Sequence, residues 1–120
     1  MAPQRTRAPM IKIKRVYEKP DTNDGVRILV DRLWPRGISK HAARIDQWLK
    51  DVAPTPALRQ WFSHDPTKFQ EFKKAYSRQL REKRASLNDI KRLARQHSVV
   101  SLLYAAKDRS ATMRLCCAIT

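Results

Sequence analysis

Residues 99–106 have the sequence Val-Val-Ser-Leu-Leu-Tyr-Ala-Ala, in which nearly every side chain is apolar. A short apolar run without polar alternation is typical of a strand that is buried on both faces, as in the centre of a parallel sheet. A basic loop precedes the run and Lys107-Asp108 follows it directly. We therefore expect a central strand here, with charged side chains at its carboxyl end.

Two further strands are expected nearer the N-terminus. Residues 11–17 begin with apolar and polar side chains in alternation, which indicates a half-exposed strand at a sheet edge. Turn-forming residues fill positions 18–25. Residues 26–31, Val-Arg-Ile-Leu-Val-Asp, indicate a second and more buried strand, which leads into the turn Trp34-Pro35-Arg36-Gly37.

Four helices are expected between the second strand and the third. The first covers residues 40–52, where apolar side chains recur at the helical period and Ser39 is a plausible cap. A short helix capped by Thr55 follows, and another begins at Asp65-Pro66. The fourth opens at a capping-box pattern over residues 86–89. A last short helix is expected over residues 110–120, with the two cysteines as small apolar positions.

The expected fold class is α/β, with the order strand, strand, four helices, strand, helix. A small mixed or parallel sheet of about three strands would be flanked by helices, because the long helical stretch suits a right-handed crossover between parallel neighbours. We expect a disordered tail over residues 1–10 and a single domain over residues 11–120.

Composition narrows the classes of function. The chain has 26 Lys and Arg against 11 Asp and Glu, a net charge of +15, which attracts phosphate or nucleic acid. No apolar run approaches the roughly 18–20 residues of a membrane-spanning helix, and the N-terminus lacks the apolar core of a secretory signal. Cys116 and Cys117 are adjacent, which fits neither a disulfide nor a zinc site. We expect a cytoplasmic protein with no membrane partner.

Charged residues follow both buried strands. Ligands bind outside the carboxyl ends of the strands in parallel α/β sheets. If the strands are parallel neighbours, Asp31-Arg32 and Lys107-Asp108 meet at one edge of the sheet, below the loop of Trp34 and Arg36. Arginine captures phosphate or carboxylate in bidentate fashion, and an indole stacks on rings. The candidate ligand-binding residues are Arg32, Trp34, Arg36 and Lys107, and the candidate catalytic residues include Asp31 and Asp108.

A purely structural interpretation of these charges stays open. The acidic and basic side chains would then pair with one another and fix the loop, and Asp31 and Asp108 would cap the segments that follow them. His64 beside Asp65 is a third catalytic candidate, although it also fits a plain loop residue next to a helix cap. The three histidines lack metal-ligand spacing, and two glycines are too few for a glycine-rich phosphate loop. We expect no metal and no cofactor.

Residues 68–95 are strongly basic. Such a helical face contacts phosphates in nucleic-acid-binding proteins, but it is also typical of an ordinary solvated surface. The sequence has no helix-turn-helix, zinc-finger or RNA-binding-sheet signature. The ten basic residues of this stretch are Lys68, Lys73, Lys74, Arg78, Arg81, Lys83, Arg84, Lys91, Arg92 and Arg95.

Several strings together resemble one known family. They are residues 14–17, residues 24–37 with Asp-Arg-Leu-Trp-Pro-Arg-Gly at their end, residues 48–54, residues 58–66 and residues 102–108. The chain resembles the bacterial family called domain of unknown function 488, in its YeaO-like branch, over about residues 11–108. The resemblance implies a small cytoplasmic α/β protein without an established activity. It marks as the family's signature Asp31, Arg32, Trp34, Arg36, Lys107 and Asp108.

The chain departs from the family after Asp108. Family members usually continue with a polar stretch containing His and Asn and then a longer apolar helix, whereas residues 109–120 contain neither His nor Asn. A family site that used those side chains would be incomplete here.

Three functions remain open. The first is a domain that binds a phosphorylated or otherwise anionic small molecule at the strand ends. The second is a nucleic-acid-binding accessory protein that uses the basic helices, without sequence specificity. The third is a small enzyme with Asp31 or Asp108 as general base and an arginine or lysine that stabilises negative charge. The sequence leaves the oligomeric state open.

Overall fold

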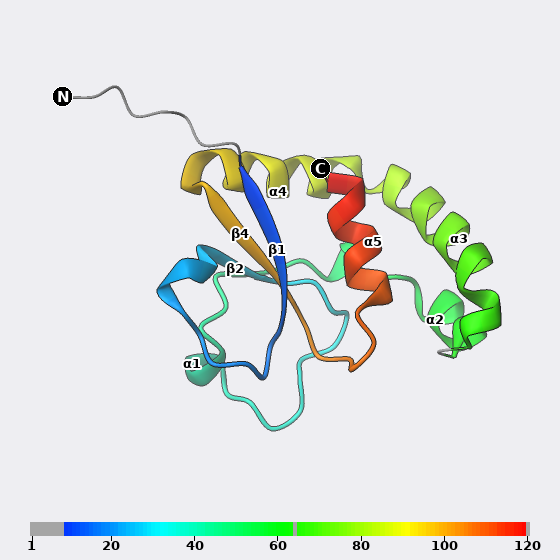
Figure 1. Ribbon diagram of the computed structural model, residues 1–120, viewed down its shortest axis with the longest axis horizontal. Coiled ribbons are helices and arrows are strands. Elements are labelled where there is room, and N and C mark those ends of the chain that lie inside the picture. The colour runs from blue at the N-terminus through cyan, green and yellow to red at the C-terminus, as the bar shows by residue number, and fades with distance from the viewer. Residues whose placement is uncertain (1–8, 64, 120) are drawn as a thin grey trace.

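The computed structural model describes residues 9–63 and 65–119, and in that part of the chain four strands form one sheet in the order β1-β4-β2-β3 (Figure 1). Every pairing in this sheet is parallel. The expected central position of residues 99–106 and the edge position of residues 11–17 are confirmed. The strands are β1 (Met10–Arg15), β2 (Val26–Leu29), β3 (Gln47–Trp48) and β4 (Val99–Tyr104).

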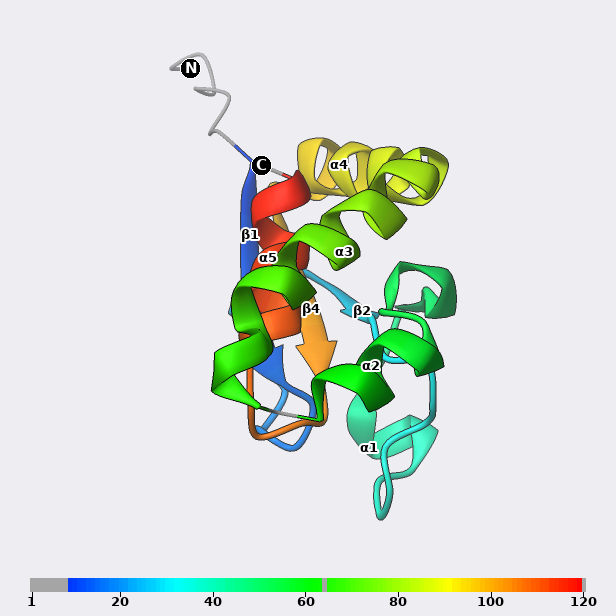
Figure 2. The ribbon, with the colours of Figure 1, turned by 90° about the vertical axis from the view of Figure 1, so that its right-hand side faces the viewer.

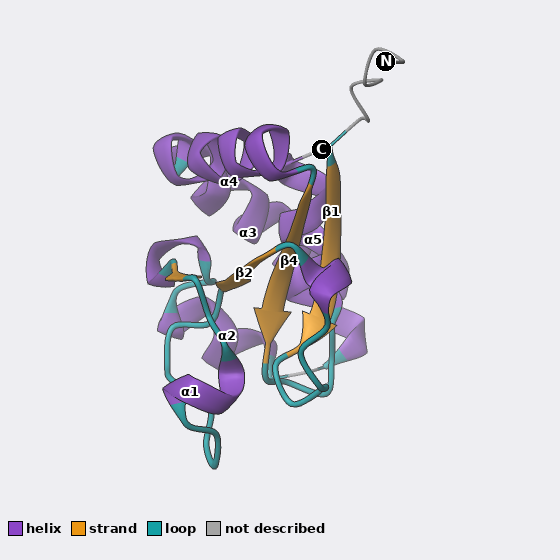
Figure 3. Ribbon diagram, turned by 90° about the vertical axis from the view of Figure 1, so that its left-hand side faces the viewer, coloured by secondary structure: helices purple, strands orange, loops and turns teal. Residues whose placement is uncertain are grey.

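The helices pack mainly on one side of the sheet. Figure 2 shows α3 and α5 in front of β1 and β4, and Figure 3, from the opposite side, shows these strands in front of the helices. Within the described residues no helix is both long enough and apolar enough to cross a lipid bilayer. The helices are α1 (Lys40–Ala43), α2 (Pro56–Phe62), α3 (Phe69–Glu82), α4 (Arg84–His97) and α5 (Ser110–Ile119), with short 3-10 turns η1 (Thr22–Asp24), η2 (Lys50–Val52) and η3 (Pro66–Lys68).

Alternate side chains of β2 and β4 point to opposite faces and build two cores. On the helical face, Ile28 and Leu102 pack against apolar side chains of α3, α4 and α5. On the other face, Leu29 and Leu103 pack against Val16 and the last residue of α1. The predicted burial of residues 99–106 on both faces is confirmed along β4, because Val100 to Tyr104 are all buried.

The prediction of one helix over residues 40–52 is wrong. Helix α1 ends at Arg44, which adopts a left-handed conformation with φ 48° and ψ 47°. The chain then pairs with β2: the Asp46 N–H donates to the Arg27 carbonyl at 2.8 Å, and the Leu49 N–H donates to the Leu29 carbonyl at 2.9 Å. Strand β2 has β4 on one side only, so its other edge gains backbone partners from β3. These backbone hydrogen bonds stabilise the strand more than the helical spacing of apolar residues favours a helix.

The remaining helices follow the sequence pattern with smaller changes. Thr55 caps α2 as expected, since its side chain accepts from the Leu58 N–H. The capping box expected at residues 86–89 is absent, because α4 already begins at Arg84. Ser86 instead donates to the Asp51 carboxylate at 2.6 Å. The predicted tail over residues 1–10 lies outside the described residues except for its last two positions, and β1 begins at Met10.

Gly25 gives a first testable prediction about the fold. Its φ is +63°, and a Cβ at this position would lie 2.1 Å from the Val99 carbonyl oxygen of β4. We expect Gly25→Ala to lower the free energy of unfolding by about 2 kcal/mol or more, measured by urea denaturation. Gly37→Ala is the matched control: φ is +78° there but nothing lies within 4 Å, so only the backbone strain of about 1 kcal/mol is expected. Equal losses in both variants would contradict the close approach to β4.

Candidate functional site

The pairing of β2 with β4 brings the carboxyl ends of both strands together. The Val30 N–H donates to the Leu103 carbonyl at 3.1 Å, and the Asp31 carboxylate accepts from the Ala105 N–H at 2.8 Å. Asp31 and Asp108 therefore line one pocket, as the strand order predicts. We call it the strand-end pocket; its volume is about 40 Å³. Its polar lining comes from Asp31, Arg59, Tyr76, Tyr104, Asp108 and Thr112.

Asp31 has an unusual environment within this pocket. Burial raises its pKa above the ordinary carboxyl value, and this effect exceeds the opposing influence of the Ala105 N–H and the Arg59 guanidinium. Burial also raises the pKa of Tyr76, whose hydroxyl donates to the Val52 carbonyl at 2.5 Å. The pocket thus contains a carboxyl group that takes up a proton more readily than usual, and a tyrosine whose hydroxyl group stays protonated.

Asp108 has a clear structural contact. Its carboxylate accepts from the Ser110 N–H at 2.9 Å and from the Ser110 hydroxyl at 2.6 Å, which caps the start of α5. The capping role left open by the sequence therefore applies to Asp108. Asp31 acts differently, because its carboxylate anchors the end of β4 rather than the segment that follows it.

Arg32 does not line the strand-end pocket. Its guanidinium donates to the carbonyls of Ala53 and Pro54 at 3.3 and 3.4 Å. It lines a separate pocket of about 250 Å³ together with Asp51 and Lys83. Its Nε is buried and has no hydrogen-bond partner among the described residues. The backbone of residues 53–54 therefore holds the side chain that we expected to bind an anion beside Lys107.

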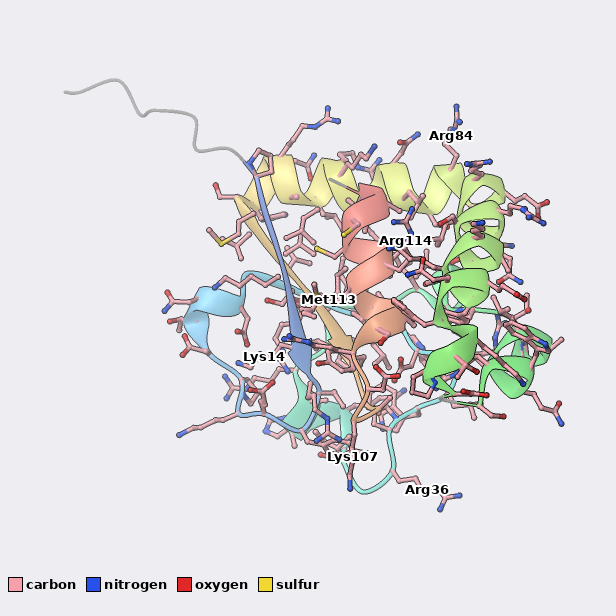
Figure 4. All side chains as sticks on the ribbon, turned by 45° about the vertical axis from the view of Figure 1, so that its right-hand side comes forward. Lys14, Arg36, Arg84, Lys107, Met113 and Arg114 are labelled. Carbon is pink, nitrogen blue, oxygen red and sulfur yellow. The ribbon has the colours of Figure 1, made fainter. Side chains whose placement is uncertain are left out.

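The other predicted ligand-binding residues take separate positions. The Trp34 indole donates to the Ile38 carbonyl at 2.7 Å and packs edge-on against Trp48, with ring centroids 5.5 Å apart. These contacts hold the indole in the core on the second face of the sheet, and stacking on a ligand stays a prediction. Arg36 and Lys107 are both exposed, at the end of the molecule remote from Arg84 (Figure 4). His64, the third catalytic candidate, lies outside the described residues.

A second and larger concave site lies between α3, α4 and α5. This central groove has a volume of about 540 Å³. Figure 4 shows Arg84 and Arg114 on this helical side of the molecule. The Arg114 Nε donates to the Ser77 hydroxyl of α3 at 2.8 Å, which holds one guanidinium in place. Its lining is Ser77, Leu80, Arg81, Arg84, Leu87, Asn88, Lys91, Arg114 and Ala118.

The sequence predicted a basic helical face that includes Arg81, Arg84 and Lys91, but it did not predict the central groove itself. Arg84, Asn88 and Lys91 are spaced i, i+4 and i+7, so the sequence alone places them on one face of a helix. Arg114 was missed because it belongs to a different helix, and only packing brings α5 beside α3 and α4. Arg59 of the strand-end pocket was missed for the same reason, since α2 reaches the strand ends through the tertiary fold.

Comparisons with known proteins place the chain in a family. Residues 10–116 match the family described as "Inactive DUF488-N3 subclade". The chain belongs to this DUF488 subclade. It is 42% identical to the uncharacterized protein Rv3073c of Mycobacterium tuberculosis over 101 residues, which cover 84% of each chain. It is 37% identical to the uncharacterized protein YeaO of Escherichia coli K12 over 98 residues, 82% of this chain and 84% of YeaO. No solved structure matches it.

The DUF488 match confirms the resemblance seen in the sequence and extends it. That resemblance ended at Asp108, whereas the family match continues to residue 116 and so includes most of α5. Arg114, which contributes a cation to the central groove, therefore lies inside the family region.

The perturbed titration of Asp31 gives a second prediction. Because its folded-state pKa is raised above the unfolded value, the native state binds more protons, so stability falls as pH rises through that interval. Asp31→Asn keeps an acceptor for Ala105 but cannot ionise. We expect the variant to gain stability relative to the wild type as the pH rises above the ordinary carboxyl range of about pH 4, measured by urea denaturation at a series of pH values. A difference that is independent of pH would refute the raised pKa, and so would an NMR titration midpoint at the ordinary carboxyl value.

Proposed function

We propose that this DUF488 domain binds a phosphate-bearing or otherwise anionic compound in the central groove and does not catalyse a reaction there. One observation supports the proposal. Helices α3, α4 and α5 bring four cationic side chains to the groove, and none of the described residues that line it is Asp or Glu. The four are Arg81, Arg84, Lys91 and Arg114.

The electrostatics of the groove favour an anion. Four like charges around one concavity repel one another, and a bound anion relieves that repulsion. Arginine guanidinium groups match phosphate and carboxylate oxygens in bidentate geometry. The hydrogen bond from Arg114 to Ser77 orders one of these groups in advance, which reduces the entropy lost on binding. Asn88 adds a neutral donor to the lining.

The strand-end pocket is a poorer site for such a ligand. Two carboxylates, Asp31 and Asp108, line it, against a single arginine. Its volume of about 40 Å³ suits a few water molecules, at about 10–15 Å³ for each. We therefore place the proposed anion site in the central groove rather than at the strand ends, where the sequence had pointed.

Two facts support a role without catalysis. The matching family is described as inactive. In addition, none of the described residues that line the central groove has a carboxylate, imidazole or thiol that could act as a general base. The arginine, lysine and asparagine side chains of this lining can donate hydrogen bonds to an anion.

An enzyme at the strand ends is the second candidate. The raised pKa of Asp31 beside Arg59 favours it, because a carboxyl group poised to exchange a proton is what general acid–base catalysis needs. The titration of Asp31 described above also tests this candidate. An ordinary pKa for Asp31 would remove its basis.

Thermal unfolding with inorganic phosphate and pyrophosphate tests the binding proposal. We expect pyrophosphate at about one hundred times its Kd to raise the Tm by roughly 10 °C. The double variant Arg81→Gln/Arg84→Gln should lose most of this shift, since both side chains are exposed and line the groove.

Two control variants separate the groove from general charge effects. Arg92→Gln removes one charge from α4 outside the groove, and Arg36→Gln removes one near the strand ends. Both should keep the full shift. If Arg36→Gln lost the rise in Tm and the double variant kept it, the anion would bind at the strand ends and the proposal would be overturned.

A further inference from the structure

Two smaller grooves adjoin the central groove and share cations with it. The first, which we call the α5 groove, has about 310 Å³ and shares Arg114 with the central groove. The second, the β1 groove, has about 340 Å³ and shares Lys91. The α5 groove is lined by Phe69, Lys73, Arg109, Ser110, Met113, Arg114 and Cys117, and the β1 groove by Pro9, Ile11, Lys91, Ala94, Arg95 and Ile119.

The three grooves are linked by the two shared cations, Arg114 and Lys91, and we call them together the basic track. None of the described residues that line them is Asp or Glu, although the chain contains 11 acidic residues. Acidic side chains are thus kept away from the whole track and not from the central groove alone. The cations of the track are Lys73, Arg81, Arg84, Lys91, Arg95, Arg109 and Arg114.

The track is too long for one phosphate or pyrophosphate. Arg109, just before the start of α5, lines the α5 groove, and Ile119, its last residue, lines the β1 groove. A helix of 10 residues is about 15 Å long. Each strand of a duplex has one phosphate per about 3.4 Å of helix axis, and successive phosphates of an extended single strand lie roughly twice as far apart, so this length accommodates about three of them.

The shape and lining of the track favour a flexible single strand. Its cations line concavities, which a flexible strand follows more readily than a rigid duplex does. Phe69 lines the α5 groove, partly buried against the core and with the Lys73 ammonium 5.8 Å from its ring centroid. Met113 lines the same groove and is 42% exposed. Aromatic rings that line a basic groove stack on nucleobases without regard to sequence.

We propose that the track along α5 binds the sugar–phosphate backbone of a single-stranded nucleic acid, with a base against Phe69. This inference rests on the proposed function, because it extends the anion site of the central groove to a polymer. Binding is independent of sequence, since the track offers cations and one aromatic ring but no array of side chains for reading base edges.

Fluorescence anisotropy of the full chain with labelled oligothymidylates tests the inference. We expect affinity to rise with length up to about three to four nucleotides and then to level off. The logarithm of the binding constant should fall with the logarithm of salt concentration, with a slope near −2, at about −0.7 for each of about three phosphates.

Variants at the two ends of the track separate this inference from the proposed function. Arg95→Gln and Arg109→Gln change exposed cations outside the central groove. Each should reduce the salt slope by about 0.7 and leave pyrophosphate binding intact. Arg81→Gln/Arg84→Gln should weaken both ligands. Phe69→Leu, with its Tm checked, should weaken the oligonucleotide but not inorganic polyphosphate of equal length.

The outcomes are distinct. Pyrophosphate binding without any rise of affinity with oligonucleotide length would overturn the inference and keep the anion site. Equal affinity for polyphosphate and oligothymidylate, unchanged by Phe69→Leu, would overturn the assignment to nucleic acid. Duplex DNA that binds more tightly than the single strand would overturn the single-stranded part. Failure of every anion to bind would overturn both proposals.

Discussion

The carboxylate of Asp24 connects elements that meet on the second face of the sheet. It accepts from the Lys14 ammonium of β1 at 3.0 Å and forms a buried ion pair with the Arg27 guanidinium of β2. The Asp24 carbonyl accepts from the Ser101 hydroxyl of β4 at 2.7 Å. Burial raises the pKa of Asp24, but the hydrogen bonds from Asp21, Lys14 and Arg27 outweigh it and hold the pKa below its usual value. The Asp24 carboxylate thus connects β1 with β2, and the Asp24 carbonyl connects this residue with β4. Removing the carboxylate would leave the Arg27 guanidinium buried without its acidic partner.

The Arg27 side chain of this polar cluster also contacts the element that covers the second face of the sheet. Arg27 donates to the Ala43 carbonyl at the end of α1, so the second face is closed by a short helix and loops. The long helices are left to cover the first face, where α3, α4 and α5 meet. The linings of the two main concavities differ in charge: the strand-end pocket has two carboxylates and one arginine among the described residues, whereas the central groove has four cations. This difference is the reason that we propose the anion site on the helical side.

The sequence predicted the parts of the fold that depend on apolar pattern and strand order. The apolar run at 99–106 indicated a buried strand, and its pairing with residues 26–31 brought Asp31 and Asp108 together. The direction of a long side chain is set by packing that has no local signal, so the sequence could not show that Arg32 turns to the backbone of residues 53–54. Residues 47–48 have a helical pattern but form a strand, because the open edge of β2 needs partners that only the tertiary structure reveals.

The place of β4 in the sheet has a consequence for how the chain reaches its native state. β4 comes after every other described strand in the sequence, yet it is the only one that pairs with both β1 and β2. During synthesis at about 5–20 residues per second, β2 waits on the order of 4–15 s for β4 to emerge. Until then β1 has no strand to pair with and both strands expose edges that invite aggregation. The high net charge of +15 then favours mutual repulsion of chains whose β1 and β2 are still unpaired.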